Sequence, residues 1–317
     1  MKIVIPDDYQ DSIHKLDAFK LLCGHEVTRY REPARDFDEL IERLKPAECV
    51  VEIRERVDFS RALIERLPNL KLIALVGSRS RAIDYDAARE HQVLVSRGAS
   101  GSPEAPAELA VALMLAARRN VVIEAPRMQR GEWPMTLSYR LRGSTLGIFG
   151  LGHIGRLVAE AGRGLGMNVL IWGRENSLNE ARAAGYEAAA SKEELFERSD
   201  VLQLLVRLSP ETRGVVTLSD LLRMKPTALF VNVARAQLIA PGALVAALQQ
   251  GRPGFAAVDV YEQEPIIGGN HPLLKMPNVL CTPHLGWAEW DTFELYFREC
   301  FEQIVNYAEG RPLRLAN

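Results

Sequence analysis

One short glycine-rich segment constrains the fold of this chain more than any other feature. Gly150–Gly155, with the sequence GLGHIG, follows the apolar run Thr145–Phe149 and opens a segment of helical periodicity. In such a turn Gly150 permits a sharp reversal, Gly152 lets the backbone approach a pyrophosphate, and Gly155 lets helix and strand pack closely. The N-terminus of the helix adds N–H groups and a positive dipole. The segment therefore predicts a dinucleotide-binding strand–turn–helix unit rather than a purely structural glycine turn.

Short apolar runs alternate with segments of helical periodicity along the whole chain, a pattern typical of α/β folds. Runs that are apolar at every position, such as Leu72–Val76, must be covered on both faces, which predicts parallel sheets between layers of helices. Strands are expected at Lys2–Ile5, Cys49–Ile53, Lys71–Val76, Val93–Val95, Thr145–Gly150, Asn168–Trp172, Val201–Val206, Ala228–Val233, Phe255–Val260 and Val279–Thr282. Helices are expected at Tyr9–Leu22, Phe37–Arg43, Phe59–Leu67, Pro103–Arg119, Gly155–Gly164, Lys192–Ser199, Gly242–Gln250 and Glu289–Glu309.

The length of 317 residues is about twice that of a typical domain. The helix expected at Pro103–Arg119 separates two series of strands, and the last helix is expected to fold back onto the first series. We therefore predict two Rossmann-like, doubly wound parallel-sheet α/β domains with a cleft between them. The substrate domain, flavodoxin-like, would comprise residues 1–98 plus 290–317, and the dinucleotide-binding domain residues 99–289.

Composition and charge exclude several classes of protein. With 47% apolar and 25% charged residues, the chain has the balance of a folded enzyme rather than of a disordered segment. Its 39 basic and 41 acidic residues leave a net charge of −2, and no basic run is suited to nucleic acid. Four scattered cysteines predict neither a metal site nor a disulfide framework. No run is long enough for a signal sequence or a membrane span, so we expect a cytoplasmic protein with no membrane partner.

The residues after the strand expected at Asn168–Trp172 bear on which dinucleotide binds. Where an acidic residue would bond the ribose 2′-hydroxyl of NAD, the chain has Gly173, followed by Arg174 and Glu175. Three interpretations stay open: Arg174 binds the 2′-phosphate of NADP, Glu175 binds the hydroxyl of NAD, or the loop is merely solvated. Because the strand-end carboxylate is missing, the expected cofactor is NAD or NADP, with NADP slightly favoured.

Three further segments stand at the ends of predicted strands, where open α/β sheets bind their ligands. They are Val231–Arg235, Ala257–Pro265 and Cys281–Trp287. With these segments the sequence resembles the D-isomer-specific 2-hydroxyacid dehydrogenase family, which contains phosphoglycerate dehydrogenase and glyoxylate/hydroxypyruvate reductase. The resemblance covers nearly the whole chain and rests also on Pro106-Ala107-Glu108, Gly150–Gly155, Pro210-Glu211-Thr212 and Met224-Lys225-Pro226.

The resemblance implies an oxidoreductase that transfers a hydride between NAD(P)H and a small 2-keto acid or D-2-hydroxy acid. Its catalytic trio would be Arg235, Glu264 and His284. The chemistry suits these residue types: His284 would exchange the proton of the developing hydroxyl as general acid/base. Glu264 would fix the histidine tautomer and favour the imidazolium, and Arg235 would bind the substrate carboxylate and polarise the carbonyl.

The resemblance also implies binding residues and partners. The expected cofactor contacts are Gly150, Gly152, His153, Ile154, Gly155, Gly173, Arg174, Glu175, Thr212, Val233 and Asp259, and the expected substrate contacts are Arg54, Gly77, Ser78 and Arg79. Asp259 would contact the nicotinamide carboxamide, as in the family, or cap a turn. The family implies a homodimer, with Pro103–Arg119 and Gly131–Pro134 at the interface. The alternative is a dinucleotide-sensing interaction protein, similar to corepressors that share this fold.

Overall fold

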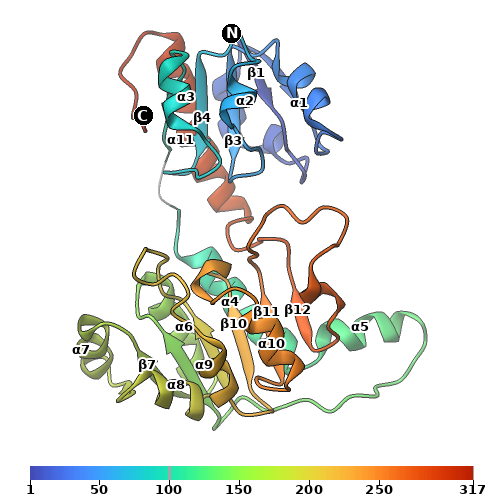
Figure 1. Cartoon of the computed structure of the whole chain (residues 1–317), viewed down its shortest axis with the longest axis vertical. Helices are drawn as coiled ribbons and strands as arrows, with labels where there is room; N and C mark the ends of the chain where they lie inside the picture. The colour runs from blue at the N-terminus through green and yellow to red at the C-terminus, as the bar shows by residue number, and fades with distance from the viewer. Residues whose placement is uncertain (99–100, 317) are drawn as a thin grey trace. The chain divides into compact units, whose positions relative to one another are not determined.

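The computed structural model describes residues 1–98 and 101–316. The chain forms two compact units: Met1–Ser102 with Ala288–Asn317, here called the split unit, and Pro103–Trp287, called the central unit. Each unit contains one sheet in which all strands pair in parallel (Figure 1). The predicted fold class, two parallel-sheet α/β domains, is confirmed.

The sheet of the split unit has five strands in the order β2-β1-β3-β4-β5. These strands are β1 (Lys2–Ile5), β2 (Glu26–Arg29), β3 (Cys49–Ile53), β4 (Leu72–Val76) and β5 (Leu94–Ser96). The helices are η1 (Ile13–Lys15), η2 (Asp17–Leu22), α1 (Phe37–Leu44), α2 (Arg61–Ile64), α3 (Tyr85–Glu90) and α11 (Trp290–Ala308). Every residue of β3 and β4 is buried, and α11 packs against β4 and η2.

Several parts of the split unit differ from the sequence-based expectation, and one of them is helix α3 at Tyr85–Glu90, which was not expected. The segment expected as one helix at Tyr9–Leu22 forms the two short 3-10 helices η1 and η2, because Leu16 between them is extended, with ψ of 143°. Strand β2 was not expected. It lies at the edge of the sheet, its exposure alternates along the strand, and Val27 is its single apolar residue, so it lacks the apolar run of the central strands.

The sheet of the central unit has seven strands in the order β12-β11-β10-β9-β6-β7-β8. They are β6 (Thr145–Phe149), β7 (Asn168–Trp172), β8 (Glu187–Ala188), β9 (Val201–Leu204), β10 (Leu229–Asn232), β11 (Phe255–Val258) and β12 (Val279–Cys281). The helices are α4 (Glu104–Arg118), α5 (Val121–Gln129), α6 (His153–Gly164), α7 (Glu175–Ala183), α8 (Lys192–Arg198), α9 (Leu218–Arg223), η3 (Ala236–Leu238), α10 (Ala243–Gln249) and η4 (Pro272–Lys275). Because β6 pairs with β7 on one side and β9 on the other, the winding reverses at β6, and its carboxyl end is where such sheets bind ligands.

Both faces of the central sheet are covered by apolar side chains. One cluster contains Phe196 and Phe230, and the other contains Met114 and Ile148. This packing leaves the ends of the strands as the place for polar groups. Within the described ranges, every helix falls short of the length and apolarity that a membrane crossing requires.

Candidate active site

The glycine loop joins β6 to α6, and its three glycines meet different surroundings. Gly150 has a φ of +102°, and a Cβ added there would lie 2.9 Å from the backbone of Val206. A Cβ on Gly155 would lie 2.3 Å from the carbonyl oxygen of Gly150. A Cβ on Gly152 would meet no atom within 4 Å. Two glycines thus allow close packing inside the protein, while Gly152 borders open space at the N-terminus of α6, as a pyrophosphate site requires.

The loop after β7 lies beside the glycine loop. A Cβ on Gly173 would stand 3.7 Å from the Cα of Gly150 and 3.1 Å from the Cβ of Ser177. Arg174 is the N-cap residue of α7 and is exposed. Glu175 lies in the first turn of α7 and pairs along the same helix with Arg182, at 3.6 Å. The acidic side chain is therefore directed along α7, and the basic side chain stands at the helix start.

The other expected cofactor residues of the central unit occupy the same strand ends. His153 is exposed and Ile154 partly buried in the first turn of α6. The hydroxyl of Thr212 donates to the carbonyl of Arg207 at 2.7 Å, so it closes the turn that follows β9. Val233, which follows β10, is buried.

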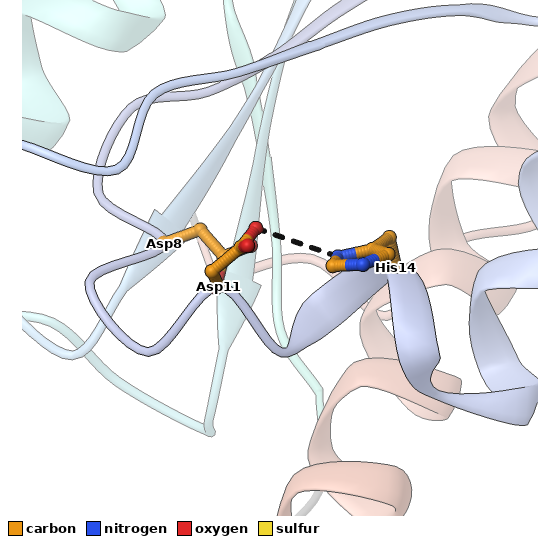
Figure 2. Close-up of side chains that lie close together, drawn as sticks. All are labelled: Asp8, Asp11 and His14. Atoms are coloured by element: carbon orange, nitrogen blue, oxygen red, sulfur yellow. Dashed lines mark ion pairs between the residues drawn. The ribbon is translucent and has the colours of Figure 1, made fainter.

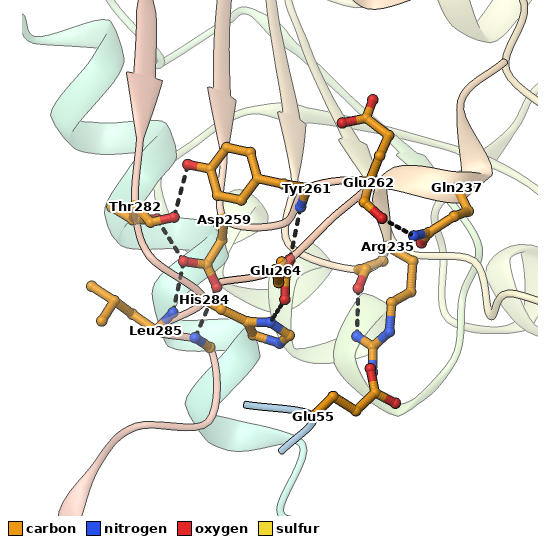
Figure 3. A network of polar contacts seen from close by, with 12 residues as sticks. Glu55, Arg235, Gln237, Asp259, Tyr261, Glu262, Glu264, Thr282, His284 and Leu285 are labelled. Carbon is orange, nitrogen blue, oxygen red and sulfur yellow. Dashed lines mark hydrogen bonds and ion pairs between the residues drawn. The ribbon is translucent and has the colours of Figure 1, made fainter. Parts of the chain in front are cut away.

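His284 and Glu264 form a close pair beyond the carboxyl ends of β12 and β11. The Nδ1 atom of His284 lies 2.5 Å from the Oε2 atom of Glu264 (Figure 3). Burial alone would raise the pKa of Glu264, but the hydrogen bond and positive charge of His284, the amide of Tyr261 and the charge of Arg235 together lower it. The carboxylate is therefore held in its ionised form against the imidazole.

Asp259 holds the loop that carries His284. Its carboxylate is fully buried and accepts three hydrogen bonds: from the Thr282 hydroxyl at 2.6 Å, the Leu285 amide at 2.7 Å and the Gly286 amide at 2.9 Å (Figure 3). Burial raises the pKa of Asp259, and these three donors oppose that rise. This arrangement is the one expected of an aspartate that caps a turn, the second of the two roles considered from the sequence.

Arg235 follows β10, and the side chain of Asn232 shapes its backbone. Asn232 is buried, accepts from the amide of Ala234 at 3.0 Å and donates to the carbonyl of Arg235 at 3.0 Å. One guanidinium nitrogen of Arg235 donates to the carbonyl of Ala234 at 2.6 Å. Arg235, Glu264 and His284 follow β10, β11 and β12, so the structure brings the three expected catalytic residues to one edge of the central sheet (Figure 3).

Three residues of this network were not singled out from the sequence: Asn232, Tyr261 and Thr282. All three stand in the strand-end motifs, and a polar residue at or just after the end of an apolar run is the signal that could have found them.

The four expected substrate residues belong to the split unit. Arg54 follows β3 and Gly77 follows β4, with φ values of +51° and +127°. The Nη1 atom of Arg54 would lie 3.0 Å from a Cβ on Gly77, so glycine lets the guanidinium approach the turn. Ser78 and Arg79 are exposed in the same turn.

One cluster of possible metal ligands occurs within the described residues. Ligand atoms of Asp8, Asp11 and His14 lie within 4.8 Å of one another (Figure 2). Arg29 contacts Asp8 at 2.5 Å and Asp11 at 3.0 Å, and Arg31 contacts Asp11 at 2.9 Å. Since these guanidinium groups already balance the two carboxylates, the cluster is an ion-pair network of the split unit and does not call for a cation.

Comparisons with known proteins agree with this geometry. The family model described as "D-isomer specific 2-hydroxyacid dehydrogenase, NAD binding domain" matches residues 111–286. A glyoxylate reductase of Aeropyrum pernix is 34% identical over 300 residues, which are 91% of this chain and 88% of the relative. A D-3-phosphoglycerate dehydrogenase of Methanocaldococcus jannaschii is 37% identical, and the match covers 86% of this chain and 52% of the relative. The chain thus spans about half the length of that dehydrogenase.

A solved structure supports the same assignment over the full length of the chain. The phosphoglycerate oxidoreductase from Vibrio cholerae o395 superposes with a TM-score of 0.92 at 47% identity, and the match covers 98% of this chain and 99% of that one. These relatives are named as reductases, dehydrogenases or oxidoreductases, which gives the alternative of a dinucleotide-sensing interaction protein no support. The chain therefore belongs to the D-isomer-specific 2-hydroxyacid dehydrogenase family of oxidoreductases and carries the dinucleotide-binding domain of that family.

Proposed function

We propose that this protein reduces a small 2-keto acid to the D-2-hydroxy acid, or catalyses the reverse oxidation, with Arg235, Glu264 and His284 as its catalytic residues. The observation that carries the proposal is the 2.5 Å contact between His284 and Glu264 at the carboxyl edge of the central sheet. The glycine loop opens at the same edge, after β6.

The central unit suits a nicotinamide dinucleotide. The open space beside Gly152 and the N-terminus of α6 fit the pyrophosphate, and Gly173 and Arg174 border the position of a ribose. When bound, the nicotinamide supplies or accepts the hydride of the reaction. The further contacts that we propose to the cofactor come from Gly150, His153, Ile154, Gly155, Thr212 and Val233.

Residues of the chain donate the proton and bind the charged carboxylate of the substrate. Glu264 accepts from Nδ1 of His284, which leaves Nε2 as the nitrogen that gives its proton to the carbonyl oxygen during reduction. The ionised Glu264 is placed to balance the positive charge of the proton-donating imidazole. Arg235 offers paired donors to the substrate carboxylate and stabilises negative charge on the carbonyl oxygen.

We further propose that the split unit acts as the substrate domain and the central unit as the dinucleotide-binding domain. Gly77, Ser78 and Arg79 would offer backbone N–H groups to the substrate carboxylate, and Arg54 would line the pocket. The support is the approach of the Arg54 guanidinium to the Gly77 turn within the split unit.

NADP is the cofactor favoured by the loop after β7, residues Gly173, Arg174 and Glu175, here called the ribose loop. A carboxylate at the end of β7 would repel the 2′-phosphate, but Gly173 occupies that position, and Glu175 pairs with Arg182 along α7. Arg174 can meet the phosphate in a charge-assisted contact worth about 1.5–3 kcal/mol, or roughly 10- to 150-fold in affinity. Arg174→Ala should therefore weaken NADPH much more than NADH in a fluorescence titration. Tighter binding of NADH by the wild type, or equal weakening of both cofactors, would contradict this preference.

We also propose that the protein is a homodimer in the reducing cytoplasm. No residue of α5 is buried, and Figure 1 shows α5 extending away from the sheet of the central unit. In α5 and the segment after it, Val122, Met128, Trp133 and Leu137 are 49%, 60%, 76% and 95% exposed, an apolar surface suited to a partner copy. All four cysteines are free, which fits a reducing compartment. Sedimentation should show a dimer that Leu137→Ser weakens; a monomeric wild type would contradict the dimer.

A screen of 2-keto acids with NADH and NADPH tests the proposed reaction. We expect consumption of the reduced cofactor with glyoxylate or hydroxypyruvate, and a D product by chiral chromatography where the product is chiral. His284→Ala should lower kcat/KM by at least ~10²-fold, because the proton donor is lost, while cofactor binding survives. An L product, or near-wild-type turnover by His284→Ala, would refute the assignment.

A further inference from the structure

Tyr261 contacts both segments that carry the His284–Glu264 pair. It follows β11 and is 7% exposed. Its backbone amide donates to Oε1 of Glu264 at 2.7 Å, and its hydroxyl donates to the carbonyl of Thr282 at 3.0 Å (Figure 3). Tyr261 thus binds the carboxylate of Glu264 through its amide and the loop that carries His284 through its hydroxyl.

The carbonyl of Thr282 is also the acceptor that fixes the backbone of His284. The amide of His284 donates to it at 3.1 Å, and His284 has a φ of +53°, in the left-handed region that non-glycine residues seldom adopt. Such a conformation persists only where its surroundings hold it. The Tyr261 hydroxyl meets the same carbonyl that accepts from the His284 amide, so together with the bonds from Asp259 it bears on the orientation of the imidazole.

The chemistry of the phenol suits a lasting role as hydrogen-bond donor. Burial, together with the neighbouring Cys281, Asp259 and Glu264, raises the pKa of Tyr261. The hydroxyl therefore stays protonated and remains a donor. The ring adds an edge-on contact with His271, at 5.1 Å between ring centroids, which holds the side chain without the help of the hydroxyl.

We propose that Tyr261 is a positioning residue of the active site, whose hydroxyl holds the His284 turn while its amide holds Glu264. The proposal rests on the proposed function for its kinetic consequence. Tyr261 does not touch the reacting atoms; it acts through Thr282 and Glu264. A phenylalanine at this position would keep the ring and the amide but lose the bond to the turn.

Tyr261→Phe is the informative variant. Loss of one buried hydrogen bond that orients the proton donor should lower kcat by about 3- to 10-fold. KM for the keto acid and the dissociation constant of the cofactor should stay within twofold of wild type. In proton NMR, the low-field resonance of the His284 Nδ1–H, assigned by its loss in Glu264→Gln and His284→Ala, should broaden or shift upfield.

Ser199→Ala is the matched control. In the wild type, the buried hydroxyl of Ser199 also donates to a carbonyl, that of Leu195 at 2.5 Å. Ser199, however, lies at the amino end of β9, the end opposite to the candidate site. We expect the variant to lower the melting temperature without moving kcat or the His284 resonance. The proposal is overturned if Tyr261→Phe keeps wild-type kcat, or if Ser199→Ala lowers kcat equally. Should the wild type reduce no 2-keto acid, the proposed reaction fails, and the His284 resonance alone decides whether Tyr261 positions the pair.

Discussion

Glu264→Gln should slow the reaction strongly while leaving the fold intact. Glutamine has the shape of glutamate and keeps an oxygen that can accept from the Tyr261 amide. It removes the negative charge beside Nδ1 of His284. The imidazolium that must form before reduction then loses its counter-charge, and an amide N–H turned towards the ring would favour the wrong tautomer.

The size of the effect follows from the separation and exposure of the pair. Two unit charges about 4 Å apart interact by about 4 kcal/mol at an effective dielectric constant of about 20. The side chains of His284 and Glu264 are 24% and 26% exposed. Solvent therefore screens part of this attraction, leaving roughly 2 kcal/mol. At about 1.4 kcal/mol per tenfold, kcat/KM should fall by about 10- to 100-fold.

Steady-state kinetics with the best keto acid found in the screen measure this loss. Glu262→Gln is the matched control, because Glu262 stands two residues away and pairs with His271 at 2.9 Å, but its side chain is 59% exposed. That variant should change kcat/KM by less than about twofold, as expected for a surface pair. The reasoning is refuted if Glu264→Gln stays within about threefold of wild type, or if both variants lose activity equally.

Three further predictions address the substrate, the cofactor loop and stability. Arg235→Ala should lower kcat/KM by at least ~10²-fold with cofactor affinity retained, and unchanged kcat/KM would show that another group holds the carboxylate. Gly155→Ala should lower the unfolding free energy by about 1–3 kcal/mol, because the added Cβ would lie 2.3 Å from the carbonyl oxygen of Gly150. Gly152→Ala, whose Cβ would meet no atom within 4 Å, should instead weaken dinucleotide binding and leave the melting temperature unchanged. Burial raises the pKa of Glu52 from 4.5 to about 7, so the free energy of unfolding should fall as pH rises from about 4.5 to about 7, where the unfolded chain has lost this proton and the folded chain still holds it. In Glu52→Gln, the pH-dependent drop in the free energy of unfolding, measured with urea, should be smaller than in the wild type by up to about 3 kcal/mol. If the variant and the wild type show the same pH dependence, Glu52 is not the buried acid responsible.

The parts of the fold that the sequence predicts well are the buried strands. Strand β4 is apolar throughout, and β3 is apolar except for Glu52, because helices cover both faces of the sheet, so their composition reveals them. Strand β2 and the two-residue strand β8 lie at sheet edges, where one side needs no partner and polar residues are tolerated. Tyr9–Leu22 has helical periodicity, but a single extended residue, Leu16, divides it.

The candidate site also contains residues that the sequence predicts well and contacts that it does not predict. Arg235, Glu264 and His284 stand in motifs that predict them as candidate catalytic residues without coordinates. The contacts of Asp259 with residues 282–286 join segments more than twenty residues apart, so they depend on how β11 and β12 pair. The direction of an exposed side chain such as Arg174 depends on solvent and on neighbours that no short motif encodes. Hence the ribose loop left three interpretations open where the trio left one.

The discontinuity of the split unit affects how this chain folds during synthesis. Helix α11 covers β4, yet about 185 residues of the central unit emerge from the ribosome between the two, which takes roughly 10–40 s at 5–20 residues per second. During that interval the face of the first sheet that α11 covers stays uncovered, and the central unit is complete and free to fold before α11 is made. The nascent chain is then most exposed to aggregation and to chaperones. The side chains that end this exposure are Phe293, Tyr296, Phe297, Cys300, Phe301 and Ile304.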